Sequence, residues 1–496
     1  MPPAVARRRA PRHALFVASE ALPFSKSGGL ADVVGALPAA LARLGWSVTV
    51  VTPRYRGVTA GSLAGRLPVH VGASSYDVGL FEAPMGEGVR GLLLDVPELY
   101  DREGLYHVQN VDYADNPRRF ALLSKAALEW ARLHGEPPSV VHAHDWQAGL
   151  VPVYLRHLYA EDPVLRGVPA VFTIHNLAYQ GLFEPDWLPR LDLPWELFAI
   201  DRMEFWGRIS FLKGGINEAT LITTVSRTYA HEIQTRTFGC GFEGILQRRA
   251  DALVGIVNGI DAAAWDPTRD PYLPRPFTRD DLSGKRDAKV AVLQQYGMEA
   301  TEEALRRPLF GMISRMVDQK GLDLIAAIAE RLPGLDATFA ILGTGDPRYQ
   351  DMWRGLAARH PARVGVRIGF DEGLAHLIEA GADVFMMPSQ FEPCGLNQMY
   401  SLRYGTVPVV RAVGGLADTV VNYVPGRRGA TGIVFEDYTP DALLAALTRA
   451  IALYKQPRSW RALQRAGMQQ DYSWDRSARE YVRIYDRAMR QAAGEA

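Results

Sequence analysis

The chain contains short, continuously apolar runs that each end in a polar residue. The first set of runs lies at residues 14–19, 47–53, 140–145, 170–175, 221–226 and 253–258. Apolar residues at helical spacing fill the intervals, as between Leu30 and Leu44. Buried strands that alternate with helices are typical of a parallel sheet covered on both faces. The pattern therefore predicts a doubly wound α/β domain that binds its ligand at the carboxyl ends of the strands.

A second set of runs follows after a break. The break extends from Gly259 to about Pro308 and holds the stretch DPTRDPYLPRPFTRDD and one helical segment near residues 286–297. Apolar runs then return at residues 309–314, 337–343, 364–370, 382–389, 406–411 and 431–436. Two doubly wound domains are therefore expected, with a ligand-binding cleft between them. The expected division is a flexible basic tail at 1–12, a first domain at 13–258, an interdomain connection at 259–307, a second domain at 308–471 and a terminal helix at 472–496 that returns to the first domain.

Composition excludes several classes of protein. The 496 residues are 48% hydrophobic and 22% charged, which fits a folded chain of two or more domains. Lys+Arg and Asp+Glu both number 55, so no net positive field attracts nucleic acid or an anionic membrane. No apolar run approaches the ~18 residues that cross a bilayer. The two cysteines, Cys240 and Cys394, are too few for a disulfide framework, and a reducing cytoplasm is the expected compartment.

The segment KSGGLADV at residues 26–33 lies between the first expected strand and its helix. A glycine pair lets the backbone approach an anion closely, and a helix start offers free N–H groups. The segment matches neither GxGxxG nor GxxxxGK[ST], so the signatures of dinucleotide binding and of the P-loop are absent. A diphosphate fits this turn. A plain strand-to-helix turn with a solvated Lys26 fits equally well, and spacing alone leaves both interpretations open.

Histidines and an acid follow two further strands of the first domain. His142, His144 and Asp145 end one run, and His175 ends the next. The two histidines at i and i+2 share a strand face, but no third and fourth ligand is evident, so a metal site is disfavoured. Hydrogen-bonded core histidines are the ordinary alternative, which we favour for His142.

The segment SRMVDQKG at residues 314–321 follows the first strand of the second domain. Its two cations, Arg315 and Lys320, are five residues apart at the carboxyl end of a sheet. Such a pair can neutralise a diphosphate leaving group as charge builds up on it. An exposed basic loop is the common alternative.

Two further motifs follow in the second domain. FEPCGLN at residues 391–397 lies between a strand and a helix, so Glu392 is expected in the cleft, and the N–H groups after Gly395 could bind oxygens. A lone glutamate in a loop is more often simply solvated. GGLADT at residues 414–419 repeats the sequence of strand, glycine pair and helix.

The order and spacing of these motifs resemble those of bacterial glycogen synthases and plant starch synthases. The motifs that carry the resemblance are KSGGLADVVGALP, HAHDWQAG, HNLAYQG, NGID, SRMVDQKG, EPCGLNQMYSLRYG and GGLADT. The resemblance runs from about residue 14 to about residue 487 and ends with YSWDRSARE at 472–480. It implies the GT-B fold, with two Rossmann-like domains facing a cleft. It also implies ADP-glucose as donor and an α-1,4-glucan such as glycogen as acceptor.

The resemblance assigns expected roles to individual residues. The expected catalytic residues are Asp145, His175, Arg315, Lys320 and Glu392. The expected substrate-binding residues are Lys26, Gly28, Gly29, Asp32, Tyr100, Asn258, Cys394, Gly395, Leu396 and Thr419. Val413 departs from the family, which commonly has Thr before GGL. No metal or other cofactor is expected, because Arg315 and Lys320 supply the positive charge.

The family is retaining, and this raises the question of a nucleophile. A double displacement needs a carboxylate on the face opposite the leaving group. If His175 presents its backbone carbonyl there, as the resemblance suggests, no such carboxylate is available. We therefore expect front-face transfer, in which the acceptor 4-hydroxyl attacks from the side that ADP leaves.

Three other functions compete with this interpretation. Another GT-B transferase, of the sucrose or UDP-sugar type, is disfavoured by the strings EPCGL and HNLAYQG. A nicotinamide oxidoreductase on Rossmann domains lacks its GxGxxG. A non-catalytic glucan-binding protein with the same fold is disfavoured because Lys26, His175 and Glu392 are all present.

Overall fold

The computed structural model describes residues 12–109, 111–133 and 137–495. The expected tail at 1–12 therefore lies outside the described residues, except for Arg12, which begins the first strand. The described chain divides into two compact units. Unit 1 comprises the residues up to Val225, Ala230–Gly259 and the residues from Trp474, and unit 2 comprises Ser226–Tyr229 and Ile260–Ser473.

The described residues of unit 1 form a nine-stranded sheet. The strand order is β14-β13-β9-β8-β1-β2-β5-β4-β3, and all strands from β14 to β5 pair in parallel. In that order the strands are Leu253–Gly255, Leu221–Thr224, Ala170–Ile174, Val140–His144, Arg12–Val17, Trp46–Pro53, Val89–Asp95, Ser74–Pro84 and Ser62–Val71. Every apolar run of the first set thus overlaps a strand, which confirms the predicted parallel sheet.

The edge formed by β3, β4 and β5 was not predicted. These strands form an antiparallel meander, and β3 alternates between exposed and buried residues along much of its length. Two small sheets complete the unit. They consist of β6 (His107–Val108) with β7 (Val111–Asp112), and of β10 (Leu182–Phe183), β12 (Arg208–Ser210) and β11 (Glu204–Phe205).

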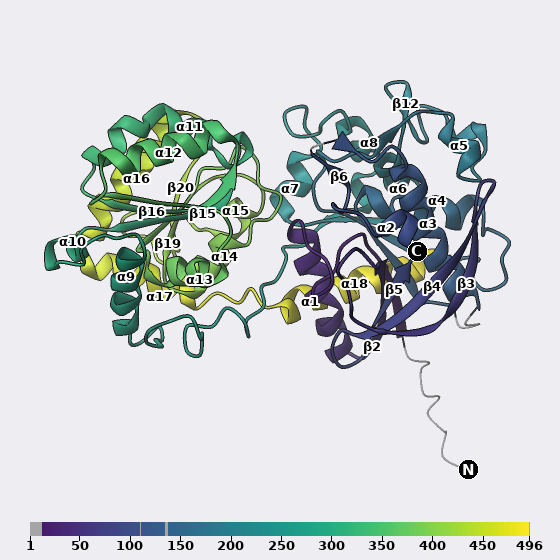
Figure 1. Ribbon diagram of the computed structural model, residues 1–496, viewed down its shortest axis with the longest axis horizontal. Helices are drawn as coiled ribbons and strands as arrows, with labels where there is room; N and C mark the ends of the chain where they lie inside the picture. Colours follow the sequence, from purple (N-terminus) through teal and green to yellow (C-terminus); the bar gives the residue numbers. More distant parts are fainter. Residues whose placement is uncertain (1–11, 110, 134–136, 496) are drawn as a thin grey trace, which may run out of the picture. The chain divides into compact units, whose positions relative to one another are not determined.

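Helices cover the sheet of unit 1. In the first part of the chain these are α1 (Gly29–Arg43), α2 (Pro97–Tyr100), α3 (Asn116–Leu133), α4 (Leu150–His157), α5 (Trp187–Arg190), α6 (Phe211–Glu218) and α8 (Glu243–Arg248). The helix α7 (Arg227–Glu232) is divided between the units, since its first three residues are grouped with unit 2. The last helix, α18 (Trp474–Ala492), lies beside α1, as its yellow ribbon shows in Figure 1. Trp474, Tyr481 and Tyr485 of α18 share one apolar core with α1 and the start of β2. The end of the chain is therefore an integral part of the first unit.

Unit 2 contains a six-stranded, wholly parallel sheet in the order β17-β16-β15-β18-β19-β20. In chain order the strands β15 to β20 are Leu309–Met316, Thr338–Gly345, Val364–Ile368, Val384–Met387, Val407–Arg411 and Ile433–Phe435. Numbered along the chain, this order reads 3-2-1-4-5-6, which is the order of a doubly wound nucleotide-binding sheet. The second predicted sheet is confirmed strand by strand.

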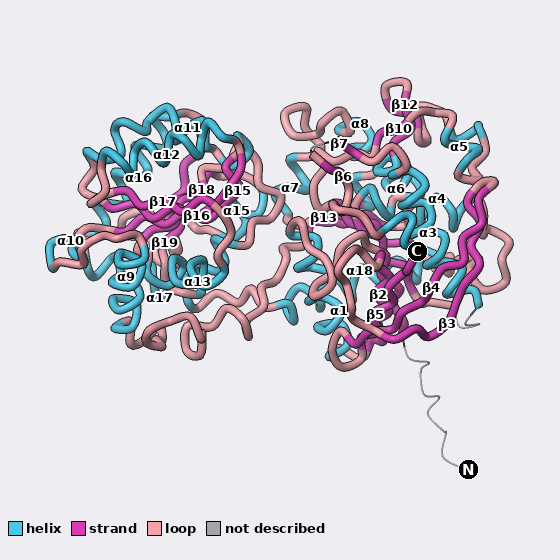
Figure 2. The backbone as a smooth tube through the Cα atoms, viewed as in Figure 1, coloured by secondary structure: helices cyan, strands magenta, loops and turns pink. Residues whose placement is uncertain are grey.

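Helices lie on both faces of this second sheet, as Figure 2 shows, with α11, α12 and α16 on one face and α9, α13 and α17 on the other. Their bounds, with those of the short helices, are α9 (Ser283–Gln295), α10 (Glu302–Arg306), α11 (Leu322–Ile328), α12 (Pro347–Arg359), α13 (Glu372–Gly381), α14 (Asn397–Arg403), α15 (Gly414–Thr419), α16 (Pro440–Tyr454) and α17 (Pro457–Met468). Apolar side chains of the sheet and of α11, α12, α16 and α17 form one continuous core that includes Phe310, Phe339 and Trp353.

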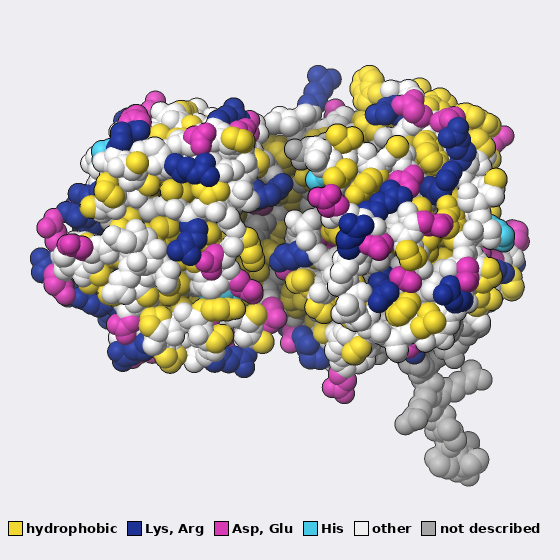
Figure 3. Space-filling model, viewed as in Figure 1, with side chains coloured by type: hydrophobic (Ala, Val, Ile, Leu, Met, Phe, Trp, Pro, Cys, Tyr) yellow, Lys and Arg dark blue, Asp and Glu magenta, His cyan; other side chains and the backbone are white. Residues whose placement is uncertain are grey.

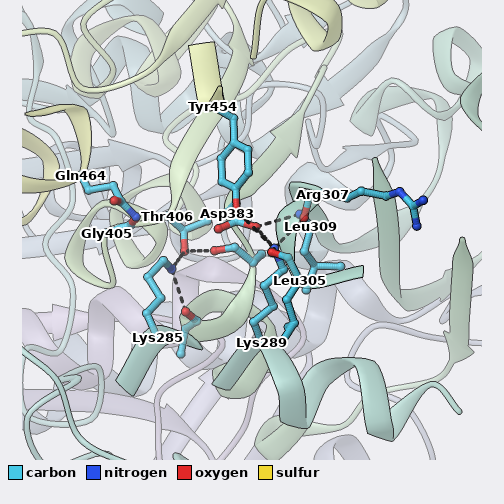
Figure 4. Close-up of polar contacts among 12 residues, drawn as sticks. Lys285, Lys289, Leu305, Arg307, Leu309, Asp383, Gly405, Thr406, Tyr454 and Gln464 are labelled. Atoms are coloured by element: carbon cyan, nitrogen blue, oxygen red, sulfur yellow. Dashed lines mark hydrogen bonds and ion pairs between the residues drawn. The ribbon is translucent and has the colours of Figure 1, made fainter. Parts of the chain in front are cut away.

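Two buried lysines fix α9, which belongs to the segment expected as an interdomain connection, within unit 2. Lys289 Nζ donates to Asp383 Oδ2 at 2.6 Å and to the Arg307 carbonyl at 2.6 Å (Figure 4). Lys285 Nζ donates to Thr406 Oγ1 at 2.6 Å and to the Ala380 carbonyl at 2.7 Å. Residues 260–307 are thus grouped with the second unit.

The surface carries both signs of charge. On the face shown in Figure 3, Lys and Arg side chains alternate with Asp and Glu side chains over each unit, in keeping with their equal numbers. Among the described residues, no helix is both long and apolar enough to span a bilayer.

Candidate active site

Each unit has one point in its sheet where the strand order reverses. In unit 1, β2 lies on one side of β1 and β8 on the other; in unit 2, β16 and β18 flank β15 in the same way. Open α/β sheets bind ligands in the crevice outside the carboxyl ends of the strands at such a point. Expected site residues of both units follow the strands at these points. The loop with Lys26 follows β1, Asp145 follows β8, Lys320 follows β15 and Glu392 follows β18.

The glycine-containing loop after β1 surrounds a carboxylate of its own chain. Glu20, which is only 3% exposed, accepts hydrogen bonds from the Ser27 N–H and from the Gly28 N–H, the latter at 3.3 Å. Its other oxygen accepts from Ser27 Oγ at 2.5 Å and from the hydroxyl of Tyr106. Two of the loop's N–H groups are therefore already occupied by an anion.

The remaining part of the loop is open toward a ligand. A Cβ atom built on Gly28 or Gly29 would meet nothing within 4 Å, so packing within the protein does not require glycine at either position. Helix α1 begins at Gly29, and its first-turn N–H groups have no helical partner. Lys26 Nζ lies 2.7 Å from Asp32 Oδ1 in a partly exposed ion pair. Burial raises the pKa of Asp32, against the opposing effect of Lys26. Lys26, Gly28, Gly29 and Asp32 thus lie together in this loop and the first turn of α1.

Asp145 adopts a backbone conformation that a non-glycine residue seldom takes. Its φ is 54° and its ψ −178°, directly after β8. Strain of this kind persists only where the surrounding structure enforces it, and it is common at functional sites. The carboxylate accepts a hydrogen bond from the backbone N–H of His175 at 2.7 Å. Burial raises the pKa of Asp145 to about 7, although the N–H groups of His175 and Asn176 favour the ionised form.

His175 is connected to a second buried imidazole. His175 Nε2 lies 3.0 Å from His144 Nδ1, and burial lowers the pKa of His175 to about 3, so its ring is neutral at pH 7. His142 lies deeper in the core, with Nδ1 2.7 Å from the Tyr485 hydroxyl and Nε2 2.6 Å from Thr173 Oγ1. The interpretation of His142 as a hydrogen-bonded core residue is confirmed. Across the described ranges, no group of three or more His, Cys, Asp and Glu side chains could hold a metal ion.

Lys320 and Glu392 form an ion pair at the reversal point of unit 2. Lys320 Nζ lies 2.6 Å from Glu392 Oε2, and their side chains are 19% and 6% exposed. Ser389 Oγ donates to the same carboxylate oxygen at 3.0 Å. The alternative of a solvated loop glutamate is therefore wrong for Glu392, because the structure buries its side chain and pairs it. Arg315 is exposed, and its guanidinium donates to Gln319 Oε1 at 3.0 Å.

The loop that carries Glu392 packs on the glycine pair before α15. A Cβ atom on Gly414 would lie 1.9 Å from the Glu392 carbonyl oxygen, and one on Gly415 would lie 2.0 Å from the Cys394 carbonyl oxygen. The Gly415 N–H donates to the Glu392 carbonyl at 3.1 Å. This glycine pair is therefore required for close backbone packing that positions Glu392. The neighbouring Val413 is buried.

The residues after Glu392 form the rest of this loop. Cys394 is buried, Gly395 has a φ of 71°, and Leu396 precedes the first residue of α14. The hydroxyl of Thr419 donates to the Gly415 carbonyl at 2.6 Å and accepts from Gln398 Nε2 at 3.1 Å. In this structure Thr419 is buried, and its hydrogen bonds to Gly415 and Gln398 stabilise the loop.

Two expected substrate-binding residues have contrasting surroundings. Asn258 is buried, and its Oδ1 has no hydrogen-bond partner among the described residues, so this oxygen is available to a ligand group. Tyr100 has no exposed surface, and its hydroxyl donates to the Arg119 carbonyl at 2.7 Å. A direct contact between the Tyr100 side chain and a sugar is therefore not available in this structure.

Sequence reasoning missed Glu20 and Phe370. Glu20 follows an apolar strand at the carboxyl edge of the sheet, which is the signal that identified Asp145. Phe370, two residues after β17, is 89% exposed at the same edge of the second sheet. The apolar run at residues 364–370 predicts a buried strand, so the sequence pattern does not identify this exposed ring.

Known proteins match the chain over nearly its whole length. The family described as starch synthase catalytic domain matches residues 13–248, and the family of glycosyl transferases group 1 matches residues 298–466. The glycogen synthase of Koribacter versatilis (strain Ellin345) is 45% identical over 484 residues, which cover 97% of this chain and 99% of the relative. That of Anaeromyxobacter dehalogenans (strain 2CP-C) is 50% identical over 95% of this chain and 98% of the relative.

Solved structures agree with these relatives. The catalytic domain of starch synthase IV from Arabidopsis thaliana, bound to ADP and acarbose, has a TM-score of 0.88 at 33% identity, over 97% of this chain and 100% of that chain. Sucrose-phosphate synthase from Thermosynechococcus elongatus has a TM-score of 0.58 at 18% identity, over 96% of this chain and 99% of that chain, which shows a shared fold alone. The predicted fold class, two Rossmann-like domains of the GT-B type, is confirmed. The chain is an enzyme of glucosyl transfer in glycogen synthesis and belongs to the glycogen and starch synthase family.

Proposed function

We propose that this enzyme transfers glucose from ADP-glucose to the non-reducing end of an α-1,4-glucan such as glycogen, with retention of configuration and in the cytoplasm. The observation that carries the proposal is the ion pair of Lys320 with Glu392 at the reversal point of the second sheet. The Arabidopsis starch synthase, whose structure holds ADP and acarbose, supports the same classes of donor and acceptor.

In the proposed reaction, the cations of unit 2 stabilise the departing ADP. Lys320 is held by Glu392 and largely shielded from water, which strengthens its attraction to a phosphate oxygen. The exposed guanidinium of Arg315 can make two parallel hydrogen bonds to the same diphosphate. Preorganised positive charge at the atoms where negative charge develops lowers the barrier, and it fills the role that a metal ion has in other transferases.

Glu392 acts on the sugar in this scheme. One of its carboxylate oxygens accepts from Lys320 and Ser389, which orients the group and leaves the other oxygen for the glucosyl hydroxyls. Its negative charge also steadies the positive charge that builds up at the anomeric carbon as the bond to ADP breaks.

The surroundings of Asp145 support front-face transfer. The Asp145 carboxylate accepts from the backbone N–H of His175 and is buried, so it serves as a hydrogen-bond acceptor for the chain. A nucleophile for double displacement must instead face the anomeric carbon. In the scheme proposed, ADP departs and the acceptor 4-hydroxyl attacks from the same side, with His175 lining the opposite face through its backbone carbonyl.

The loop of Lys26, Gly28 and Gly29 is assigned to the diphosphate. The free first-turn N–H groups of α1 and the open space beside both glycines support this role. Asn258 is assigned to the donor through its unpartnered Oδ1. Phe370 offers an exposed ring on which a purine base can stack.

A parallel assay with two donors tests the proposal. The protein is incubated with glycogen and either ADP-glucose or UDP-glucose, and release of ADP or UDP is measured together with glucosyl incorporation. We expect transfer from ADP-glucose to exceed transfer from UDP-glucose, and digestion of the product by an α-1,4-specific exo-hydrolase to confirm the linkage. Preferred use of UDP-glucose would overturn the donor assignment, and a β-linked product would overturn retention.

A further inference from the structure

The strongest unassigned feature is the buried carboxylate of Glu20 inside the donor loop. Four donors converge on it. Oε2 accepts from the backbone N–H groups of Ser27 and Gly28, and Oε1 accepts from the hydroxyls of Ser27 and Tyr106. No ion pair among the described residues includes Glu20, although Lys26 is a near neighbour in sequence, because Lys26 pairs with Asp32 instead. Glu20 is therefore a carboxylate solvated entirely by neutral donors.

Burial of a carboxylate without a counter-ion costs free energy of folding. A buried charge without a counter-ion persists only when several hydrogen bonds replace the lost water, and here both oxygens have two. Burial raises the pKa of Tyr106, so its hydroxyl stays protonated and donates to Glu20. That hydroxyl also lies 2.8 Å from Ser19 Oγ. The loop is thus attached to the end of β1 and to the segment around Tyr106 through one carboxylate.

We propose that Glu20 is a positioning residue for the donor, which holds Ser27 and Gly28 so that Lys26 and the first turn of α1 face the diphosphate. The Ser27 and Gly28 N–H groups serve Glu20, and the N–H groups of Gly29 to Ala31 are left for the ligand. Without the carboxylate, four donors lose their acceptor and the loop moves between conformations, so the donor must order it on binding. This inference rests on the proposed function of the loop.

Two substitutions of Glu20, by Met and by Gln, distinguish the need for a hydrogen-bond acceptor from the need for a negative charge. Glu20→Met preserves the volume and removes the acceptor from all four donors. Glu20→Gln keeps one oxygen for the two N–H groups, and its amide can donate to the two hydroxyl oxygens, so it should rescue the loop. Glu20→Asp keeps the charge but withdraws the carboxylate by one methylene, and it serves if Glu20→Met fails to fold. Glu218→Met is the matched control, because Glu218 is a buried carboxylate of the same unit that accepts from Arg202 at 3.0 Å and lies outside the site.

Two measurements are made on the full-length variants. Amide hydrogen exchange is followed at Ser27 and Gly28 in the donor-free protein, and kcat and KM are determined for ADP-glucose. We expect Glu20→Met or Glu20→Asp to speed exchange at both amides and to raise KM about tenfold, equivalent to loss of about one charge-assisted hydrogen bond, with a smaller change in kcat. The KM of Glu20→Gln should stay within about threefold of the wild-type value. Glu218→Met should change neither the amide exchange at Ser27 and Gly28 nor the KM for ADP-glucose.

Several results would overturn the inference. One is slow exchange and an unchanged KM in Glu20→Met and Glu20→Asp. Another is tighter binding of ADP to Glu20→Met, which would make the carboxylate a competitor of the ligand. Equal effects in Glu218→Met would show general destabilisation of unit 1. If wild type fails to use ADP-glucose, the proposed function falls, whereas exchange in the donor-free protein still decides whether Glu20 holds the loop.

Discussion

Lys320 donates from Nζ to Glu392 Oε2 across 2.6 Å, and the two residues follow adjacent strands of one parallel sheet. They are 72 positions apart in the chain. The pair exists because β15 and β18 lie side by side where the strand order reverses, so the loops after both strands open on the same crevice. One relationship thus combines the cation expected to meet the diphosphate with the carboxylate expected to meet the sugar.

The first prediction concerns the carboxylate of this pair. Glu392→Gln should lower kcat by ~10²- to 10³-fold, because one electrostatic contact to the transition state is lost. Affinity for ADP should change little, since the side chain acts on the sugar. Steady-state kinetics and calorimetric titration with ADP measure the two quantities.

A matched control exists in the same unit. Glu379 is fully buried and accepts from Ser401 Oγ at 2.6 Å, and burial raises its pKa well above the ordinary value. Glu379→Gln keeps an oxygen that can accept from Ser401 and lies outside the loop that carries Glu392, so it should leave kcat unchanged. Near-normal turnover in Glu392→Gln would remove Glu392 from the catalytic residues.

The second prediction concerns the glycine pair behind Glu392. Gly415→Ala places a Cβ 2.0 Å from the Cys394 carbonyl oxygen, so the loop carrying Glu392 must shift. A displacement of about 1 Å at a catalytic group can cost ~10²-fold in rate. We expect a loss of kcat of that order with a folded protein, checked by kinetics and thermal unfolding. Gly334→Ala is the control, because a Cβ there meets nothing within 4 Å; equal activity of the two variants would contradict the packing argument.

The third prediction is that turnover needs no divalent metal. The positive charge at the proposed diphosphate site comes from Lys320 and Arg315. Transfer of glucose from ADP-glucose to glycogen should therefore keep its full rate in EDTA. Activity that disappears on chelation and returns with Mg²⁺ or Mn²⁺ would show that the protein's own cations do not suffice.

The fourth prediction concerns the buried lysine that secures α9 (Figure 4). Lys289→Met leaves the Asp383 carboxylate, whose side chain is 12% exposed, without its cation. Removing one partner of a buried pair typically costs about 3–5 kcal/mol, and we expect a loss of unfolding free energy in this range. Lys455→Met breaks a pair with Asp336 in which the side chains are 61% and 50% exposed, and it should cost less than about 1 kcal/mol. Denaturant unfolding of both variants checks the difference.

The parallel strands were predictable because burial on both faces makes them continuous apolar runs. Strand β3 was not predictable, because its residues alternate between exposed and buried positions. It pairs in antiparallel orientation with the next strand, β4. A half-exposed edge strand has a weak signal in a sequence that is searched for buried runs. The limits of the predicted domains stay predictions.

The candidate site shows a similar division. Residues at strand ends, such as Asp145 and Glu392, were found because topology alone brings them to the ligand edge. The role of Glu20 depends on Tyr106, 86 positions away, and no local pattern encodes that contact. Thr419 is the opposite case. Its position in the motif suggested a ligand contact, but its hydroxyl is used by Gly415 and Gln398.

The last prediction follows from the pKa of Asp145, which burial raises from 3.8 to about 7. Between these values the folded protein binds a proton at Asp145 that the unfolded chain has released, so this group makes the unfolding free energy fall as pH rises from about 4 to about 7. Asp145→Asn carries no titrating group, and its carbonyl oxygen can still accept from the His175 N–H. The stability of Asp145→Asn relative to wild type should therefore increase with pH by at least about 1 kcal/mol across that window and be constant above it. Denaturant unfolding at pH 5, 6, 7 and 8 measures the difference, and carbon-detected NMR of the Asp145 carboxyl should place its titration midpoint near pH 7. A midpoint near 4, or a stability difference independent of pH, would show that the carboxylate is already ionised in the acid range and that the His175 and Asn176 N–H groups outweigh its burial.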